Sequence, residues 1–415
     1  MKIVRNSYFA FLLAINLVHP SLGLAQSAGD VLSGPNSTPE TLEADAEEKD
    51  DVLDIDRQDG FDAWKSGLKE RTGLDFGFDY NALGFLATDS LGKDRSGSGS
   101  FRIFGTWELL NRGSPNSGSL VFKFENRHRY GSVAPTDFGG ELGYVGLPSS
   151  VFSDQGNRVT HLYWEQNFAD GLGVSYIGWL DVTDYTDVYA LASPWTGFEN
   201  LAFQTGSGSI GGLPDGALGA MVGGFLSDNY YAAASFADAN ADPTDPLEGF
   251  DTLFDDGETF KTFEFGWTSG GERLFVDNAH VTFWQIDERG DAGTPDGHGV
   301  SFSYTRGIDD TWLPFLRGGW AEDGGSLYEA SLSAGFGYTQ EPGRNLLGVG
   351  LNWSRPNDGT FGSGLDDQYT LEAFQRWQIT QGVAITPSVQ IIHNPAFNPD
   401  DDTIAFFGLR IRAAF

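Results

Sequence analysis

Charged and apolar side chains alternate along the stretch SLVFKFENRHRY, Ser119 to Tyr130. Lys123, Glu125, Arg127 and Arg129 fall on odd positions, whereas the leucine and both phenylalanines fall on even positions. Successive side chains of a β-strand point to opposite faces, so this spacing predicts a strand with one apolar and one densely charged face. Such a row of charged groups can hydrogen-bond the hydroxyls of a neutral sugar, and the arginine fork can hold two of them at once.

Two orientations of this strand are open. In a soluble protein the apolar face would point into a core, whereas in a membrane barrel it would meet lipid and the charges would line an aqueous lumen. Charges placed against lipid would cost several kcal/mol. We therefore interpret the row from Lys123 to Arg129 as a pore lining.

Further candidate pore residues lie on the polar faces of other predicted strands, or carry an aromatic ring on which a sugar ring can slide. They are His161, Tyr163, Glu165, Trp179, His280, Trp284, Glu372 and Arg376, and Arg410 and Arg412 offer the same chemistry on the last strand. For the tryptophans, the alternative is a place in the aromatic girdles at the membrane surfaces.

The composition favours an all-β protein of the cell envelope. The 415 residues include 56 glycines and 14% aromatic residues, and the mean hydropathy is -0.27. Such a chain is too polar for helical membrane spans and too aromatic for disorder. It has no cysteine, which excludes a disulfide framework and a thiolate metal site.

The first residues predict secretion. Lys2 and Arg5 precede an apolar run and a small-residue site, so residues 1–25 are predicted to be a signal peptide cut after Ala25. The remaining chain carries 23 basic and 58 acidic residues, which argues against nucleic acid as a partner. Residues 26–59 are rich in like charges and poor in apolar residues, and are predicted to be a disordered acidic tail.

Residues 60–415 are predicted to form a transmembrane antiparallel β-barrel preceded by a short helix around Phe61 to Leu68. Runs of about ten residues alternate in polarity between turn-forming clusters. Sixteen such runs are clear and a weaker one lies near Asn200 to Gly206, so we expect 16 strands, with 18 as the alternative. The segment from Asp184 to Phe203 is neither strand nor polar loop, and we expect it to fold into the lumen.

The last predicted strand ends in an outward-facing aromatic residue, Phe415. A soluble sheet would leave this strand as an apolar edge, which soluble proteins avoid. The strand therefore predicts an outer-membrane barrel that inserts with the help of the assembly machinery and then contacts membrane lipid and lipopolysaccharide.

Other functions are less well supported. Paired carboxylates could serve a glycosidase, but no catalytic motif such as GxSxG or HExxH appears. A general or other small-solute outer-membrane porin is the main alternative, and a soluble sugar-binding β protein is a further one. No cofactor is expected, although Asp238, Asn240 and Asp242 could bind a calcium ion in a loop that lacks the EF-hand glycine and glutamate.

Eight runs resemble, in order, segments of the carbohydrate-selective porins, the OprB-type family of Gram-negative outer membranes. They are GSLVFKFENRHRYGS, LYWEQNF with GWLDVTDYTD, FADANADPTDP, NAHVTFWQIDER, WLPFLRGGW, DQYTLEAFQRWQIT, TPSVQIIHNPAFNPD and GLRIRAAF. The resemblance spans about Phe61 to Phe415. It implies a 16-stranded barrel of the outer membrane through which monosaccharides and small oligosaccharides diffuse.

Overall fold

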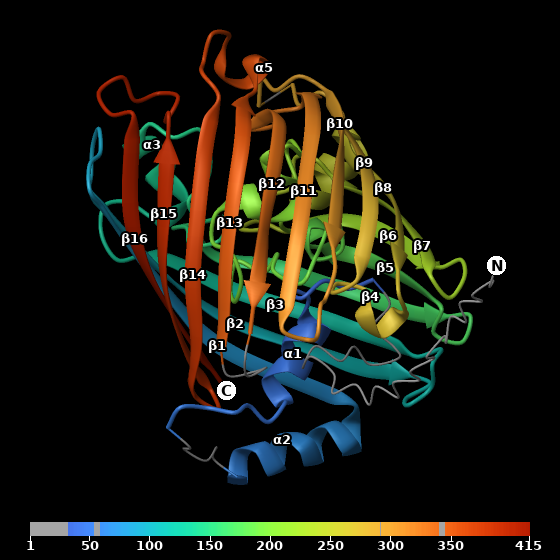
Figure 1. The fold of residues 1–415 in the computed structure, drawn as a ribbon. Coiled ribbons are helices and arrows are strands. Elements are labelled where there is room, and N and C mark those ends of the chain that lie inside the picture. The colour runs from blue at the N-terminus through green and yellow to red at the C-terminus, as the bar shows by residue number, and fades with distance from the viewer. Residues whose placement is uncertain (1–31, 54–58, 291, 340–344) are drawn as a thin grey trace, which may run out of the picture.

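The protein is a closed antiparallel barrel of 16 strands, in which β1 pairs with both β2 and β16 (Figure 1). The computed structural model describes residues 32–53, 59–290, 292–339 and 345–415. The strands are β1 (Leu74–Ala87), β2 (Arg95–Leu110), β3 (Gly118–Arg129), β4 (Gly156–Phe168), β5 (Gly173–Leu180), β6 (Ala217–Phe225), β7 (Tyr230–Asp238), β8 (Thr259–Thr268), β9 (Asn278–Ile286), β10 (Gly297–Thr305), β11 (Trp312–Asp323), β12 (Tyr328–Tyr338), β13 (Asn345–Pro356), β14 (Gln368–Thr380), β15 (Val383–His393) and β16 (Thr403–Ala414). The predicted count of 16 is confirmed.

The helices are few and mostly short. They are α1 (Thr38–Ala46), α2 (Asp59–Thr72), α3 (Phe138–Leu142), α4 (Gly249–Asp251) and α5 (Asp358–Phe361), with 3-10 turns η1 (Pro135–Asp137), η2 (Val182–Asp184), η3 (Leu201–Phe203), η4 (Thr205–Gly208) and η6 (Gly271–Arg273) and a π turn, η5 (Thr252–Asp256). Helix α2 contains the predicted short helix. Among the described residues, no helix is long and apolar enough to cross a membrane.

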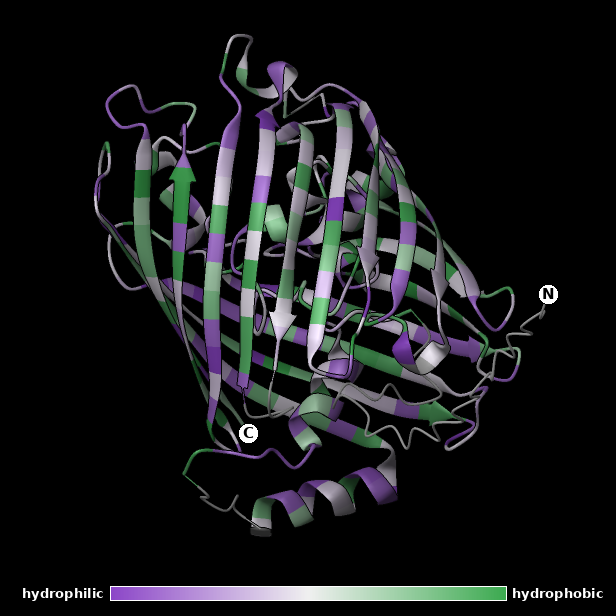
Figure 2. Cartoon of the chain, in the orientation of Figure 1, coloured by the Kyte–Doolittle hydropathy of each residue, from purple (hydrophilic) through white to green (hydrophobic). Residues whose placement is uncertain are grey.

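The alternation along β3 places its apolar face outside and its charged face in the lumen. Phe124 is 43% exposed, whereas Lys123 and Arg127 are 2% and 3% exposed. The same alternation of green and purple runs along the strands in Figure 2. A closed sheet leaves no free strand edge, and apolar residues cover its outer face, as a membrane-spanning barrel requires.

Large aromatic side chains project from the outer face near the strand ends. They include Trp107, Tyr130, Tyr230, Tyr304, Trp312, Tyr369 and Trp377, all at least 40% exposed. Amphipathic rings favour the level of the lipid headgroups, so these residues form the aromatic girdles that position the barrel in the bilayer.

The two ends of the barrel differ in their connections. Short turns join β2 to β3, β4 to β5, β6 to β7 and β14 to β15, and helix α2 and the C-terminus lie at this same end (Figure 1). The long connections, residues 130–155, 181–216 and 239–258, lie at the other end. Short turns face the periplasm in outer-membrane barrels, so the long loops face the exterior.

The expected disorder of the acidic tail is wrong for its described part. Residues 38–46 form α1, which lies within the periplasmic opening of the barrel, above α2 (Figure 1). Ser37 caps this helix through its hydroxyl, which accepts from the N–H of Glu40, and Pro39 lies in the first turn. The prediction of disorder used the charge and the apolar content of the tail, and these two helix-capping residues did not enter it. The predicted signal peptide and residues 26–31 and 54–58 lie outside the described residues.

The long connection between β5 and β6 folds into the lumen, as expected for Asp184 to Phe203. The weak seventeenth strand near Asn200 to Gly206 is wrong, because these residues form the turns η3 and η4. Gly206 has a φ of 67°, a left-handed conformation that interrupts any extended run. Buried phenylalanines of this segment pack on the inner wall instead of joining the sheet.

We predict that Phe415→Ala lowers the fraction of protein that assembles into a folded barrel. The main chain of Phe415 exchanges two hydrogen bonds with that of Phe78, at 2.9 and 3.3 Å, and the two rings stack at 5.3 Å between centroids. Heat-modifiable migration of outer-membrane fractions on a gel measures the folded fraction. Phe407→Ala is the matched control, because Phe407 is equally exposed on β16. Equal folded fractions for the two variants would contradict a special role for the terminal residue.

Candidate pore constriction

Two external loops fold into the lumen and narrow it. The connection between β5 and β6, residues 181–216, is called here the constriction loop. Glu372 on β14 accepts the backbone N–H groups of Glu199 and Asn200 at 2.7 and 2.9 Å. The connection between β3 and β4 reaches the same wall through Tyr144, whose hydroxyl lies 2.8 Å from that of Tyr328. Glu372 therefore holds the loop and is covered by it.

Asp187 anchors the middle of the constriction loop. Its carboxylate accepts hydrogen bonds from Arg317 at 2.6 Å, from His280 at 2.8 Å and from the N–H of Gly206 at 2.5 Å. Burial alone would raise the pKa of Asp187, but Arg317 and the hydrogen bonds lower it, so the carboxylate is ionised at neutral pH. His280 thus serves as an anchor in the wall.

Arg410 fixes the next part of the loop. Its guanidinium donates to the carbonyls of Pro194 and Gly197 at 2.8 and 2.9 Å, and lies 3.7 Å from Glu199. A planar fork that holds these two carbonyls also fixes the two residues between them, Trp195 and Thr196. Trp195 is buried, and its ring contributes to the lining of the cavity described below.

Trp195 packs between a charged group of β2 and an aromatic group of the connection between β3 and β4. The guanidinium of Arg102 lies 4.0 Å from the indole centroid, and Phe152 contacts the indole edge-on at 5.3 Å. Arg102 is paired in turn with Asp79. A desolvated cation over an indole contributes about 2 kcal/mol, so this contact helps to hold the loop across the lumen.

The charged row of β3 is largely paired with the constriction loop. Lys123 lies 3.6 Å from Asp184, Glu125 lies 2.6 Å from Arg127, and Arg127 lies 3.5 Å from Asp215. Buried charges are retained in proteins when they are paired in this way. Arg129 differs, because it ends the strand half-exposed beside Asp154 at 3.2 Å. Whether the pore-lining row extends to Arg129 stays a prediction.

A cluster of ionisable groups surrounds Asp184. His161 on β4 lies 2.8 Å from Asp184, and Lys123 lies 4.0 Å from Asp181. Burial, together with the Asp184 carboxylate, raises the pKa of Asp181 to about 7, so this residue is partly protonated at neutral pH.

The remaining candidates of β4 lie on the lumen face but are covered. Tyr163 is buried 5.0 Å from Tyr176, centroid to centroid, and Glu165 accepts a hydrogen bond from Asn167 at 3.1 Å. Whether these residues contact a solute stays a prediction.

The two predicted lumen tryptophans are buried, and Trp284 belongs to an apolar cluster of the wall. Trp179 donates its indole N–H to the carbonyl of Val159 at 2.6 Å, and Trp284 stacks on Phe260 at 6.4 Å between centroids. Each is less than 5% exposed. This packing does not support their interpretation as sliding surfaces for sugar rings.

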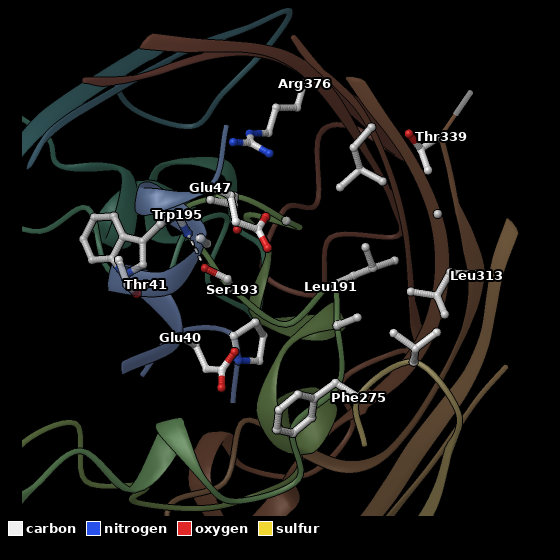
Figure 3. Close-up of a pocket in the computed structure, with 18 of the residues that line it drawn as sticks. Glu40, Thr41, Glu47, Leu191, Ser193, Trp195, Phe275, Leu313, Thr339 and Arg376 are labelled. Atoms are coloured by element: carbon white, nitrogen blue, oxygen red, sulfur yellow. Dashed lines mark hydrogen bonds between the residues drawn. The ribbon is translucent and has the colours of Figure 1, made fainter. Parts of the chain in front are cut away.

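A cavity of about 280 Å³ lies between the constriction loop, α1 and the wall of β11 to β14 (Figure 3). Arg376 reaches into it from β14, Glu40 and Glu47 face it from α1, and Leu191 and Leu313 form an apolar side. Its volume is near the lower end of ligand pockets, roughly 300–1,000 Å³. The cavity therefore combines charged donors, acceptors and apolar surface at the size of a small solute.

The residues proposed for calcium form internal contacts of their loop. Asp238 accepts the N–H of Asn240 at 2.9 Å, and Asp242 accepts the N–H and hydroxyl of Thr244 at 2.7 and 2.8 Å. A loop calcium site at these residues stays a prediction.

A family model described as "Carbohydrate-selective porin, OprB family" matches residues 118–306 and 289–415. The chain belongs to this porin family. The predicted resemblance is thus confirmed, and the OprB-family chain is a porin of the Gram-negative outer membrane. A comparison with curated protein sequences found no match.

Solved porins share the fold of this OprB-family chain. The high-pH structure of Pseudomonas putida OprB matches with a TM-score of 0.70 and 14% identity, covering 89% of this chain and 99% of that one. Its low-pH structure gives 0.52 and 10%, covering 89% and 100%. A triple mutant of Rhodopseudomonas blastica porin gives 0.50 and 15%, covering 82% and 100%. At these identities the likeness concerns the fold.

Three residues that organise the constriction were not singled out from the sequence: Arg317, Asp187 and Arg102. Arg317 had a readable signal, since it stands in the middle of the apolar run WLPFLRGGW, where an ionisable residue usually faces a bundle or barrel interior. Arg102 lies between Phe101 and Ile103 in the same manner. Asp187 lies in a loop, where one acidic residue among 58 gives no such signal.

We predict that Asp187→Ala loosens the constriction loop. The substitution leaves Arg317 buried without its carboxylate, and breaking a buried pair costs about 3–5 kcal/mol. Single-channel recordings of the variant should show a larger and noisier conductance than the wild type. Asp154→Ala is the control, because its partner Arg129 is half-exposed. A quiet, unchanged conductance in Asp187→Ala would show that Asp187 does not anchor the loop.

Proposed function

We propose that this porin lets monosaccharides and small oligosaccharides diffuse across the outer membrane. The observation that carries the proposal is the cavity beside the constriction loop. In this cavity Arg376 faces the carboxylates of Glu40 and Glu47, and Leu191 and Leu313 form an apolar side (Figure 3). The family and the fold indicate a channel rather than an enzyme.

The chemistry of a sugar fits this arrangement. A sugar is neutral, carries many hydroxyls and has ring faces that are partly apolar. Guanidinium groups donate to hydroxyl oxygens and carboxylates accept from hydroxyl hydrogens, while Leu191, Leu313 and the nearby Phe275 supply apolar surface. A simple ion would use only one of these features.

Diffusion through such a channel requires weak binding. A site that held the sugar tightly would trap it, whereas several weak sites in series let it advance. The arginines of the constriction are mostly engaged with carboxylates or carbonyls, so a sugar hydroxyl competes for donors that are already partly satisfied. This competition keeps each contact weak.

Membrane lipid and lipopolysaccharide would contact the apolar belt and the external loops, and the assembly machinery would recognise the last strand. The exposed apolar residues of β16, which end with Phe415, support this part of the proposal.

Liposome swelling with purified protein tests the proposed function. Glucose and a disaccharide should enter faster than an amino acid of similar size. Equal rates for all three solutes would make the protein a general porin, and no swelling with any solute would contradict a channel.

We predict that Arg376→Ala slows glucose entry relative to amino acid entry. Arg376 reaches into the cavity, and its guanidinium is a donor that alanine cannot replace. The ratio of the two swelling rates is the measurement, because it cancels differences in the amount of inserted protein. Arg355→Ala is the control, since Arg355 is exposed beside Asp367 outside the cavity. An unchanged ratio would remove Arg376 from the sugar path.

A further inference from the structure

We propose that the acidic N-terminal segment, residues 32–53, is a second selectivity element that narrows the periplasmic half of the channel and makes it acidic. This inference rests on the proposed channel function, and it concerns a segment that precedes the barrel in the chain. The segment lies inside the lumen, and there it selects solutes by size and charge.

The segment is fixed to the constriction loop at its start. The N–H of Gly34 donates to the carbonyl of Asp184 at 2.6 Å, and the amide of Asn36 donates to the Asp184 carboxylate at 2.9 Å. The hydroxyl of Thr38 lies 3.0 Å from Nδ1 of His161 on the barrel wall. The first turn of α1 is therefore held on the wall near β4.

The other end of the segment is fixed on β16, four strands from β4 around the barrel. Asp45 receives two hydrogen bonds from Arg412 on β16, both at 2.7 Å. The N–H groups of Val52 and Leu53 then donate to the carbonyls of Gln378 and Ile379 at 3.1 Å each. The segment thus runs along the inner wall past β3, β2 and β1 and continues along the end of β14.

The ion pair at Asp45 belongs to a larger network. Arg412 also donates to Asp79 at 2.8 Å, and Asp79 is paired with Arg102 beneath Trp195. Burial would raise the pKa of Asp45, but Arg412 lowers it well below its usual range. Segment and constriction loop are therefore connected through shared charged groups of the wall.

Helix α1 has a wall side and a channel side. Leu42 is buried, and its tip comes within 3.4 Å of the position that a Cβ on Gly77 of β1 would occupy. Glu40, Glu43 and Glu47 line the cavity of about 280 Å³ opposite Arg376. Because residue 77 is a glycine, the helix can lie close to the wall. The acidic side of the helix then faces the path of the solute.

The acidic side also faces the periplasmic exit. Glu47 and Glu48 line both the inner cavity and a second, more open cavity of about 1,010 Å³, whose lining includes residues of α2. A solute that leaves the inner cavity towards the periplasm therefore passes these two carboxylates and Lys49, which also lines both cavities. Within a Debye length of about 8 Å at physiological ionic strength, the two carboxylates outweigh the single ammonium group, so this stretch attracts cations and repels anions.

Two consequences follow for solutes. The helix occupies part of the lumen cross-section, so it limits the size of oligosaccharide that can pass. Its carboxylates disfavour anionic solutes such as sugar phosphates, while neutral sugars pass and use the carboxylates as acceptors. The segment thus refines the selectivity set by the constriction loop.

A cysteine on the channel side tests this placement without removing the segment. The protein has no cysteine of its own, so Glu47→Cys provides a single thiol. A charged methanethiosulfonate reagent added from the periplasmic side should form a mixed disulfide and lower the single-channel conductance in one step, by about half or more, because the adduct stands in the path. Glu70→Cys on the exposed surface of α2 is the control and should show no step.

Removal of the segment and of its charge separates the two effects. Deletion of residues 32–53 should raise conductance and increase trisaccharide entry relative to glucose. Glu47→Gln combined with Glu48→Gln should leave that size ratio unchanged and shift the reversal potential in a KCl gradient towards weaker cation preference. Glu70→Gln should leave both readouts unchanged.

The outcomes are distinct from those that test the channel itself. If the unmodified protein conducts and admits sugars, but labelled Glu47→Cys shows no step and the glutamine variant keeps its reversal potential, the segment does not face the path. If the deletion variant fails to assemble, labelling and charge removal still decide the question. Failure of the unmodified protein to conduct would instead overturn the proposed function.

Discussion

The structure depends on one constraint: in hydrocarbon, every backbone polar group must be bonded within the protein. A sheet meets this constraint only by closing on itself, and β1 does so by pairing with β16. Closure assigns one face of every strand to lipid and the other to a lumen. Each charged residue in an apolar run must then point inwards, which explains the positions of Lys123, Arg317 and Arg410.

Charged groups inside a barrel must also have partners. Neighbouring cations repel one another, and a buried cation without a counter-charge carries a large desolvation cost. The constriction loop supplies the partners. Asp187 pairs with Arg317, and Glu199 and nearby carbonyls engage Arg410. The charges of the wall thus determine where the loop lies. The solute passage is the space left between the loop and the wall.

Helix α1 extends the same logic towards the periplasm. Its carboxylates would be repelled by a negatively charged lumen, but β14 and β16 place the cations Arg376 and Arg412 on the wall beside them. An acidic segment with few apolar residues can therefore be ordered by ion pairs, helix capping and the burial of Leu32 and Leu42. The low apolar content of the segment predicts disorder only when the partner surface is ignored.

The sequence by itself determined the number of strands, their inward and outward faces, the uneven loop lengths and the inward fold near Asp184 to Phe203. These features follow from local periodicity and turn residues, which act within a few positions along the chain. Only the tertiary structure decided which side chains of the lumen contact one another. It placed Trp195 between Arg102 and Phe152, buried Trp179 and Trp284, and brought Asp45 of α1 to Arg412, 367 positions away in the chain. Pairing across a barrel joins residues far apart in sequence, and no local pattern specifies the partner.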